Sequence, residues 1–600
     1  MTLLHEIRSC STHACRTSGY RLVPALPTMA DERPHKKPRL EPDHAADIRA
    51  KRSAFLSSLS RSISPPPGAT FVSYTNAIVK TNIEERSKLP ASDSISDRTV
   101  SSSVQNELKE AANGPKKPRV LCSPFQLLRA RSLPSQNNAD TISLHEIFGD
   151  PLIREAWIFN FCFNVDWTMQ HFDADVRELV KVKIVHGSWK RDDGNRIAIE
   201  EHLKKWTNVE DIKAYLPDQF GTHHSKMIIL FKHDDTAQVI IHTANMLEID
   251  WDHMTQAAWR SPILPLIPTD KQSEDGNTIG SGERFKSDLL RYLKAYGGKL
   301  KPLINQLSLH DFSAVRAALI ASVPSHVKVS DPADKLWGHL SLANALAAMR
   351  QDRSKTSCTT ENSHLICQVS SIATLPQTWL NDTIYKAAST NSTSIIFPTP
   401  TDLRNALTGY AAGGSIHTKA SSTAHLKQIS LLRPQLNRWN VQSSNPATRA
   451  GRHLIPPHIK TYICFTSKPT ADKSTPDIEW VLITSANLST QAWGTAPKLP
   501  KGSKDASEAE VHIQSFEIGV LVWPELFADK DINGQKSRVR MVPTFGTDTP
   551  EPSLVNAEDE IVVGMRMPYD LPLTPYGPDE LPWSPSMTYS EPDNLGRLWG

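Results

Sequence analysis

The sequence has few cysteines and no long apolar run. Its seven cysteines are scattered and include no Cys-x-x-Cys pair. This argues against a zinc site or a disulfide framework and favours a reducing compartment. Apolar stretches such as Met227–Phe231 and Ile518–Trp523 are far too short to cross a bilayer. We therefore expect no membrane partner.

A large charge of one sign is also missing. The formal net charge of the 600-residue chain is +3, and charged residues make up 22% of it. No general basic field attracts nucleic acid, so any affinity for DNA must come from a local patch.

Residues 1–140 lack the apolar periodicity of a folded domain and are rich in serine, proline and charge. This composition predicts a disordered tail. The run Lys-Lys-Pro-Arg occurs twice, at 36–39 and 116–119, and predicts import into the nucleus. The first 28 residues contain three arginines and one acid, so a mitochondrial fraction is the alternative, and Met29 is an alternative start.

The rest of the chain contains an internal duplication. Each copy predicts a strand, a turn, a second strand and then a helix just past an asparagine. The first copy consists of 224–226 (His-Ser-Lys), 227–231, 239–241, 242–245 (His-Thr-Ala-Asn) and 255–259 (Thr-Gln-Ala-Ala-Trp). The second consists of 458–460 (His-Ile-Lys), 461–465, 480–483, 484–487 (Thr-Ser-Ala-Asn) and 490–493 (Thr-Gln-Ala-Trp).

Only the complete ordered set indicates a site. His-x-Lys alone occurs seven times, and five of these occurrences lack the strands, the asparagine and the Gln-Ala-Trp letters that follow in the two copies. One copy could be a buried histidine that satisfies backbone groups. Two matched copies point instead to one site built from both.

The chemistry of this set suits a phosphate ester. Residues i and i+2 of a strand share a face, so each histidine and its lysine project together. Lysine and asparagine can donate to phosphate oxygens. One imidazole can attack phosphorus while the other protonates the leaving oxygen. No carboxylate cluster accompanies the set, so we expect no metal and no cofactor.

On these residues the chain resembles the phospholipase D superfamily and, within it, the tyrosyl-DNA phosphodiesterase branch. The superfamily pattern His-x-Lys-x4-Asp has Phe231 and Phe465 at the aspartate positions, as expected for that branch. Further stretches resemble its signatures: 164–167 (Asn-Val-Asp-Trp), 220–224 (Phe-Gly-Thr-His-His), 410–415 (Tyr-Ala-Ala-Gly-Gly-Ser), 457–462, 484–489 and 515–520.

The resemblance implies an α/β fold of two similar phospholipase D-like halves related by a pseudo-two-fold axis, at 141–322 and 323–600. It also implies a monomer that hydrolyses the bond between a tyrosine and a DNA 3′-phosphate, as left by a stalled type I topoisomerase. Its partners would be single- and double-stranded DNA ends and a topoisomerase-derived peptide.

The family's roles transfer residue by residue. His224 would be the nucleophile and form a phosphohistidine, and His458 would be the general acid and then the general base. Lys226, Asn245, Lys460 and Asn487 would hold the phosphate. Gln256 and Glu517 resemble the polar residues that orient the imidazoles. We expect Glu517 to support His224 and Gln256 to support His458, but the sequence does not decide this pairing.

The resemblance also suggests DNA contacts. Phe220 could stack on a base, worth about 1–3 kcal/mol; the alternative is a core phenylalanine. Phe161 replaces a tyrosine that the family often has. Five residues could contact the phosphate backbone through hydroxyls and close-approaching amides: Ser370, Ser371, Gly413, Gly414 and Ser415. The alternative for 413–415 is an ordinary Gly-Gly-Ser turn.

Two other functions compete with this one. The first is a lipid phosphodiesterase or a general nuclease on the same fold. The missing aspartates, the basic runs and the absence of an amphipathic basic helix disfavour the lipid substrate. The second is an inactive DNA-binding scaffold, which two intact sets disfavour.

Overall fold

The structure is a computed structural model that describes residues 119–268, 278–354, 362–472, 475–529, 537–554 and 560–600. Within these ranges no helix is both long and apolar enough to cross a membrane. Most of the predicted tail, including the basic run at 36–39, lies outside the described residues.

The first of two seven-stranded sheets has the order β2-β8-β7-β6-β3-β4-β5. β3, β4 and β5 are parallel to one another, and the other neighbours are antiparallel. Its strands are β2 (Phe125–Leu127), β3 (Ile153–Phe159), β4 (Lys181–His186), β5 (Val209–Lys213), β6 (Met227–Lys232), β7 (Ala237–His242) and β8 (Ala257–Arg260).

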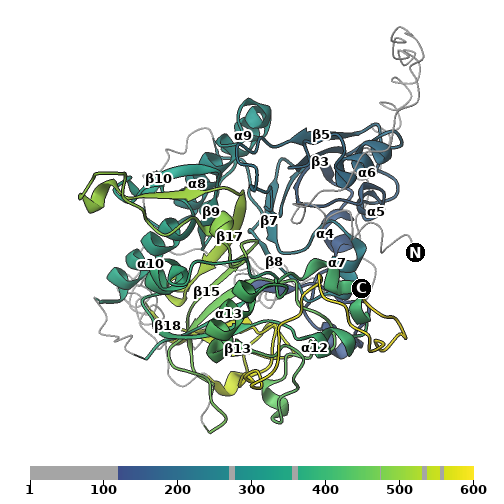
Figure 1. The fold of residues 1–600 in the computed structure, drawn as a ribbon. Coiled ribbons are helices and arrows are strands. Elements are labelled where there is room, and N and C mark those ends of the chain that lie inside the picture. The colour runs from purple at the N-terminus through teal and green to yellow at the C-terminus, as the bar shows by residue number, and fades with distance from the viewer. Residues whose placement is uncertain (1–118, 269–277, 355–361, 473–474, 530–536, 555–559) are drawn as a thin grey trace, which may run out of the picture. The chain divides into compact units, whose positions relative to one another are not determined.

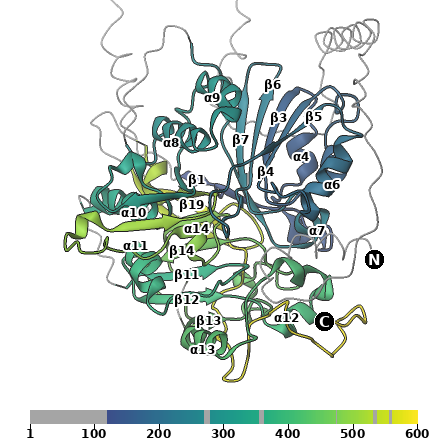
Figure 2. The same ribbon diagram turned by 45° about the horizontal axis from the view of Figure 1, so that its top comes forward.

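The second sheet has the order β13-β12-β11-β14-β15-β17-β9, again with three parallel strands at one side. Figure 2 shows strands of the first sheet in blue and β11–β14 of the second in green. The second sheet consists of β9 (Ala318–Ser322), β11 (His364–Gln368), β12 (Ser392–Ile396), β13 (Leu436–Asn437), β14 (Thr461–Phe465), β15 (Ile478–Thr484) and β17 (Glu517–Val522).

Reading the second sheet in reverse matches it to the first strand by strand, with the same parallel and antiparallel neighbours. This confirms the two similar α/β halves. The boundaries differ from those expected. β2 belongs to the first sheet although it precedes residue 141, and β9, its counterpart, belongs to the second sheet although it precedes residue 323.

Three further strands and a two-stranded ribbon complete the β-structure. β1 (Arg119–Leu121) and β18 (Arg538–Thr544) flank β19 (Glu560–Arg566), all parallel. β10 (Ser325–Lys328) pairs with β16 (Glu510–Ile513). The disorder expected up to residue 140 was therefore wrong for 119–140. β1 and β2 are held by partners more than a hundred residues away, which local composition does not reveal.

Helices cover the sheets, whose central strands are buried along nearly their whole length, as in mixed α/β sheets covered on both faces. The helices are α4 (Leu144–Phe148), α5 (Val165–Met169), α6 (Gly194–Leu203), α7 (Glu248–His253), α8 (Gly282–Lys294), α9 (Lys301–Ser308), α10 (Gly338–Ser354), α11 (Lys386–Ala388), α12 (Pro400–Arg404), α13 (Thr423–Leu432) and α14 (Thr490–Trp493).

The two sheets share one apolar core. It includes Ile229 and Ile241 of the first sheet together with Ile463 and Ile483 of the second. β7 lies against β17 and β15, as Figure 1 shows near its centre. The ends of the central strands in both halves are thereby brought to one place.

Candidate active site

The two His-x-Lys segments lead directly into β6 and β14. Both lysines are fully buried, and each Nζ donates a hydrogen bond to the carbonyl of its own histidine: Lys226 to His224, at 2.9 Å, and Lys460 to His458. The duplication seen in the sequence is therefore repeated in side-chain contacts.

Each histidine segment pairs with a segment from the other half. His223 forms a parallel bridge with Phe516, and the backbone N–H of His224 donates to the Phe516 carbonyl, at 2.9 Å. In the same way Thr255 bridges Pro457, and the N–H of His458 donates to the Thr255 carbonyl, at 3.1 Å. These reciprocal bridges place the residue after each bridge beside the opposite histidine.

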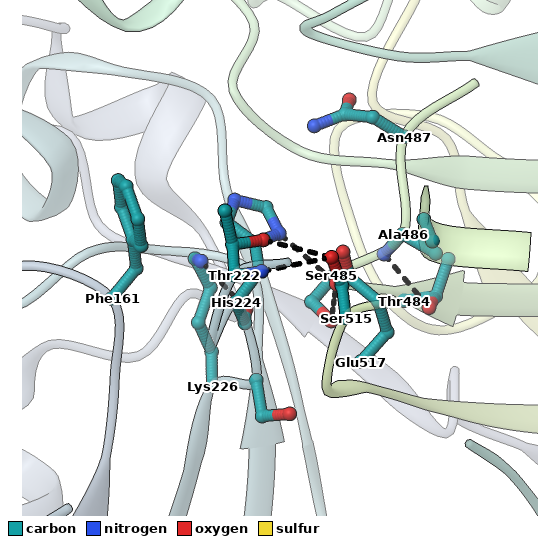
Figure 3. Close-up of polar contacts among 12 residues, drawn as sticks. Phe161, Thr222, His224, Lys226, Thr484, Ser485, Ala486, Asn487, Ser515 and Glu517 are labelled. Atoms are coloured by element: carbon teal, nitrogen blue, oxygen red, sulfur yellow. Dashed lines mark hydrogen bonds and ion pairs between the residues drawn. The ribbon is translucent and has the colours of Figure 1, made fainter. Parts of the chain in front are cut away.

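Glu517 follows the first bridge and holds His224. Its Oε2 lies 3.0 Å from Nδ1 of His224 and also accepts a hydrogen bond from the Ser485 hydroxyl (Figure 3). Burial would raise the pKa of Glu517, but the hydrogen bonds and the charges of His224 and Lys226 bring that pKa below its usual value. The carboxylate is therefore stable in its ionised form.

Gln256 follows the second bridge and holds His458. Its Nε2 lies 2.9 Å from Nδ1 of His458, and its Oε1 accepts a hydrogen bond from Thr243, at 2.7 Å. The sequence favoured this pairing of supports and histidines without deciding it, and these contacts decide it. Gln256 and Gln491 match in the sequence repeat but do not occupy equivalent positions in the fold. Gln256 precedes a strand, β8, whereas Gln491 lies in α14.

Asp250, in the first turn of α7, is a site residue that the sequence reasoning missed. It is fully buried, and its Oδ2 lies 3.1 Å from Nδ1 of His458. The same oxygen accepts hydrogen bonds from the Asn245 N–H, at 2.8 Å, and from Gln256 Nε2, at 3.2 Å. The available signal was an acid placed directly between two large apolar residues, Ile249 and Trp251.

Asn487 and Asn245 take the places expected from the duplication, at the ends of the segments that follow β15 and β7. The Asn487 Oδ1 accepts from the N–H groups of Ser370 and Ser371, at 3.0 and 2.9 Å. Its amide nitrogen is thereby fixed as the outward donor. The Oδ1 of Asn245 is buried and has no hydrogen-bond partner among the described residues.

The positive groups of the two sets lie close enough to lower one another's pKa values. Burial lowers the pKa of His458 to about 3, and repulsion from Lys460 adds to this while Asp250 opposes it. Burial also lowers the pKa of His224, which Glu517 opposes, and Lys460 of the other half contributes. Burial lowers the pKa of Lys226 to about 8. An anion between the two sets would offset this shared cost of burying positive charge.

Among the expected DNA-binding residues, Phe220 is exposed whereas the two glycines are buried. Phe220 is 69% exposed, so it is not a core phenylalanine. Gly413 is buried against Trp583, where an added Cβ would lie 2.3 Å from the indole ring, so packing alone requires glycine there. Gly414 is also buried, and Ser415 ends the same 3-10 helix.

The segment after this helix lies beside the site. His417 forms a parallel bridge with Ser371, and its N–H donates to the Ser370 carbonyl, at 2.9 Å. Phe161 lies on the opposite side, its ring 5.5 Å from the ring of His224 and 5.9 Å from Nζ of Lys226. Figure 3 shows Phe161 beside Lys226 and His224, away from Asn487.

Comparison with known proteins identifies the family. The family model described as tyrosyl-DNA phosphodiesterase matches residues 124–577. A probable tyrosyl-DNA phosphodiesterase of Schizosaccharomyces pombe is 30% identical over 536 residues, covering 80% of this chain and 96% of the relative. Tyrosyl-DNA phosphodiesterase 1 of Arabidopsis thaliana is 28% identical over 523 residues, covering 80% of this chain and 77% of the relative.

A solved structure shows the same fold. The crystal structure of the yeast tyrosyl-DNA phosphodiesterase aligns with a TM-score of 0.53 at 20% identity, over 77% of this chain and 99% of that one. Since the family match spans both histidine-bearing halves, the chain belongs to the tyrosyl-DNA phosphodiesterase family of phosphodiester hydrolases.

Proposed function

We propose that this chain hydrolyses the bond between a tyrosine and a DNA 3′-phosphate, as left by a stalled type I topoisomerase, through a covalent phosphohistidine. The observation that carries the proposal is the reciprocal support of the two imidazoles. The Nδ1 of His224 is held by Glu517, and that of His458 by Gln256 and Asp250. In each ring Nε2 is left for chemistry.

In the first step, Nε2 of His224 attacks phosphorus and the P–O bond to the tyrosine breaks. Glu517 suits this role because a carboxylate at Nδ1 favours the tautomer with a lone pair on Nε2. The leaving phenolate takes a proton from Nε2 of His458. Asp250 suits that role because its charge stabilises the protonated ring.

In the second step, neutral His458 removes a proton from water, and the oxygen attacks phosphorus. The P–N bond breaks, which frees His224 and leaves DNA with a 3′-phosphate. Throughout, Lys226, Lys460 and the Asn487 amide donate to the non-bridging oxygens, where negative charge redistributes. The phosphate charge would also raise the pKa of both histidines, which burial and the lysines lower in its absence.

We further propose that the chain acts as a monomer on single- and double-stranded DNA ends and accommodates a topoisomerase-derived peptide. A nuclear location, with a mitochondrial fraction as the alternative, rests on the basic runs and the arginines of the first 28 residues. No observation at the site favours a lipid substrate or an inactive scaffold.

The test is a comparison of a 3′-phosphotyrosyl oligonucleotide with phosphatidylcholine, both in EDTA. Release of tyrosine and a 3′-phosphate is expected. Release of choline without tyrosine would overturn the substrate, and binding of DNA ends without turnover at any pH would favour the scaffold.

A further inference from the structure

The exposed aromatic side chains of the described residues lie on three neighbouring segments of the first half. Of its large hydrophobic side chains that are exposed, three are aromatic: Trp189 at 55%, Tyr215 at 78% and Phe220 at 69%. Other tryptophans, tyrosines and phenylalanines in the described ranges are buried or partly buried. Large exposed aromatics in a cluster are a mark of a binding surface.

Strand pairing explains why the first two are neighbours. Trp189 and Tyr215 follow the ends of β4 and β5, which are parallel and paired at His186 and Lys213. The N–H of Ala214 still donates to the His186 carbonyl, at 2.8 Å. The two aromatic residues therefore lie at the same end of the first sheet, just past the carboxyl ends of β4 and β5.

The segment that carries Phe220 joins them at that edge. A Cβ added to Gly187 would lie 2.7 Å from Cβ of His223 and 3.1 Å from Cδ1 of Leu216, so the three segments are in contact. His223 directly precedes His224. The segments that carry the three rings, which we call the aromatic ledge (Trp189, Tyr215, Phe220), therefore meet beside the residue that precedes the proposed nucleophile.

The ledge also has positive charge and a fixed backbone. The Nζ of Lys190 lies 5.7 Å from the centre of the Trp189 ring, and Arg191 follows it; both side chains are exposed. In the described ranges neither forms an ion pair with a carboxylate. The Trp189 carbonyl accepts a hydrogen bond from Arg196 of α6, at 2.6 Å, which anchors the loop.

We propose that the aromatic ledge binds unpaired bases of the DNA substrate, with Tyr215 and Trp189 extending a stacking surface that starts at Phe220. The inference rests on the proposed function. Aromatic rings with nearby cations bind single strands without sequence preference, since every base has a stacking face and every nucleotide a phosphate. A double-stranded end would have to fray to reach the ledge.

The experiment measures kcat and KM with 3′-phosphotyrosyl substrates on a dinucleotide and on a longer single strand. For the long strand, Trp189→Ala and Tyr215→Ala should each raise KM about tenfold and leave kcat unchanged. Both variants should match the wild type on the dinucleotide. Trp189→Phe should restore KM, whereas Trp189→Leu, which keeps an apolar side chain without a ring face, should not.

Leu309→Ala is the control, because Leu309 is 59% exposed and not aromatic. Its KM should equal that of the wild type. If the wild type hydrolyses both substrates and the ledge variants keep its KM on the long strand, the ledge proposal is overturned and the proposed function stands. If the variants respond instead to the length of a peptide on the tyrosine, the ledge binds protein. If the wild type hydrolyses neither substrate, the proposed function itself fails.

Discussion

Substitution of Gly221 by alanine tests whether the bridge between the halves positions the nucleophile. A Cβ at this position would lie 2.2 Å from the backbone carbonyl oxygen of Gln514, and such contacts are essentially never shorter than 3.0 Å. The two segments must therefore separate by at least about 0.8 Å. That displacement would stretch the 3.0 Å contact between His224 and Glu517 beyond hydrogen-bond range.

We expect kcat of Gly221→Ala to fall about 100-fold, since a misplacement near 1 Å has a cost of that order. Overpacking should lower the free energy of unfolding by about 1–3 kcal/mol. The measurement is single-turnover release of tyrosine from a 3′-phosphotyrosyl oligonucleotide, alongside thermal unfolding.

Gly298→Ala is the matched control, because an added Cβ there would meet nothing within 4 Å. It should keep full activity. A folded Gly221→Ala protein with the wild-type kcat would refute the idea that this bridge sets the position of His224.

The remaining predictions concern the chemical roles. His224→Ala should abolish tyrosine release, whereas His458→Ala should slow hydrolysis of the intermediate and leave a DNA–protein adduct on denaturing gels; an adduct in the His224 variant instead would reverse the roles. Asp250→Asn should lower the pKa of His458 further, because it removes the charge that raises it. His458, the general acid, would then lose its proton at lower pH. When the first step limits the rate, the alkaline limb of the kcat profile should therefore move to lower pH. An unmoved limb would show that Asp250 does not set the pKa of His458. The wild-type profile should be bell-shaped, since one imidazole must be neutral and the other protonated, and a monotonic profile under rate-limiting chemistry would count against two-histidine catalysis. EDTA should not change the rate, and loss of activity that a divalent metal restores would overturn the metal-free mechanism.

Local patterns were enough to locate the strands and helices around the site. The apolar runs 227–231 and 461–465 became β6 and β14, and the second strands expected at 239–241 and 480–483 lie within β7 and β15. Period-two and helical patterns depend on neighbours in the chain, so they can be read without the fold. Domain boundaries depend on pairing between distant strands, so they could not be predicted from local patterns, as β2 and β9 show.

By itself the sequence determined the two His-Lys-Asn sets and the equivalence of the halves. Spacing along a strand decides which side chains project together, and two matched copies leave little room for chance. Only the tertiary structure decided which group supports each histidine. The counterpart of Gln256 is Glu517 rather than Gln491, because β8 and β17, not the repeated Thr-Gln-Ala-Trp letters, occupy equivalent positions in the sheets. Asp250 reaches His458 across the two halves for the same reason, since contacts between residues over two hundred positions apart are set by how the sheets pack.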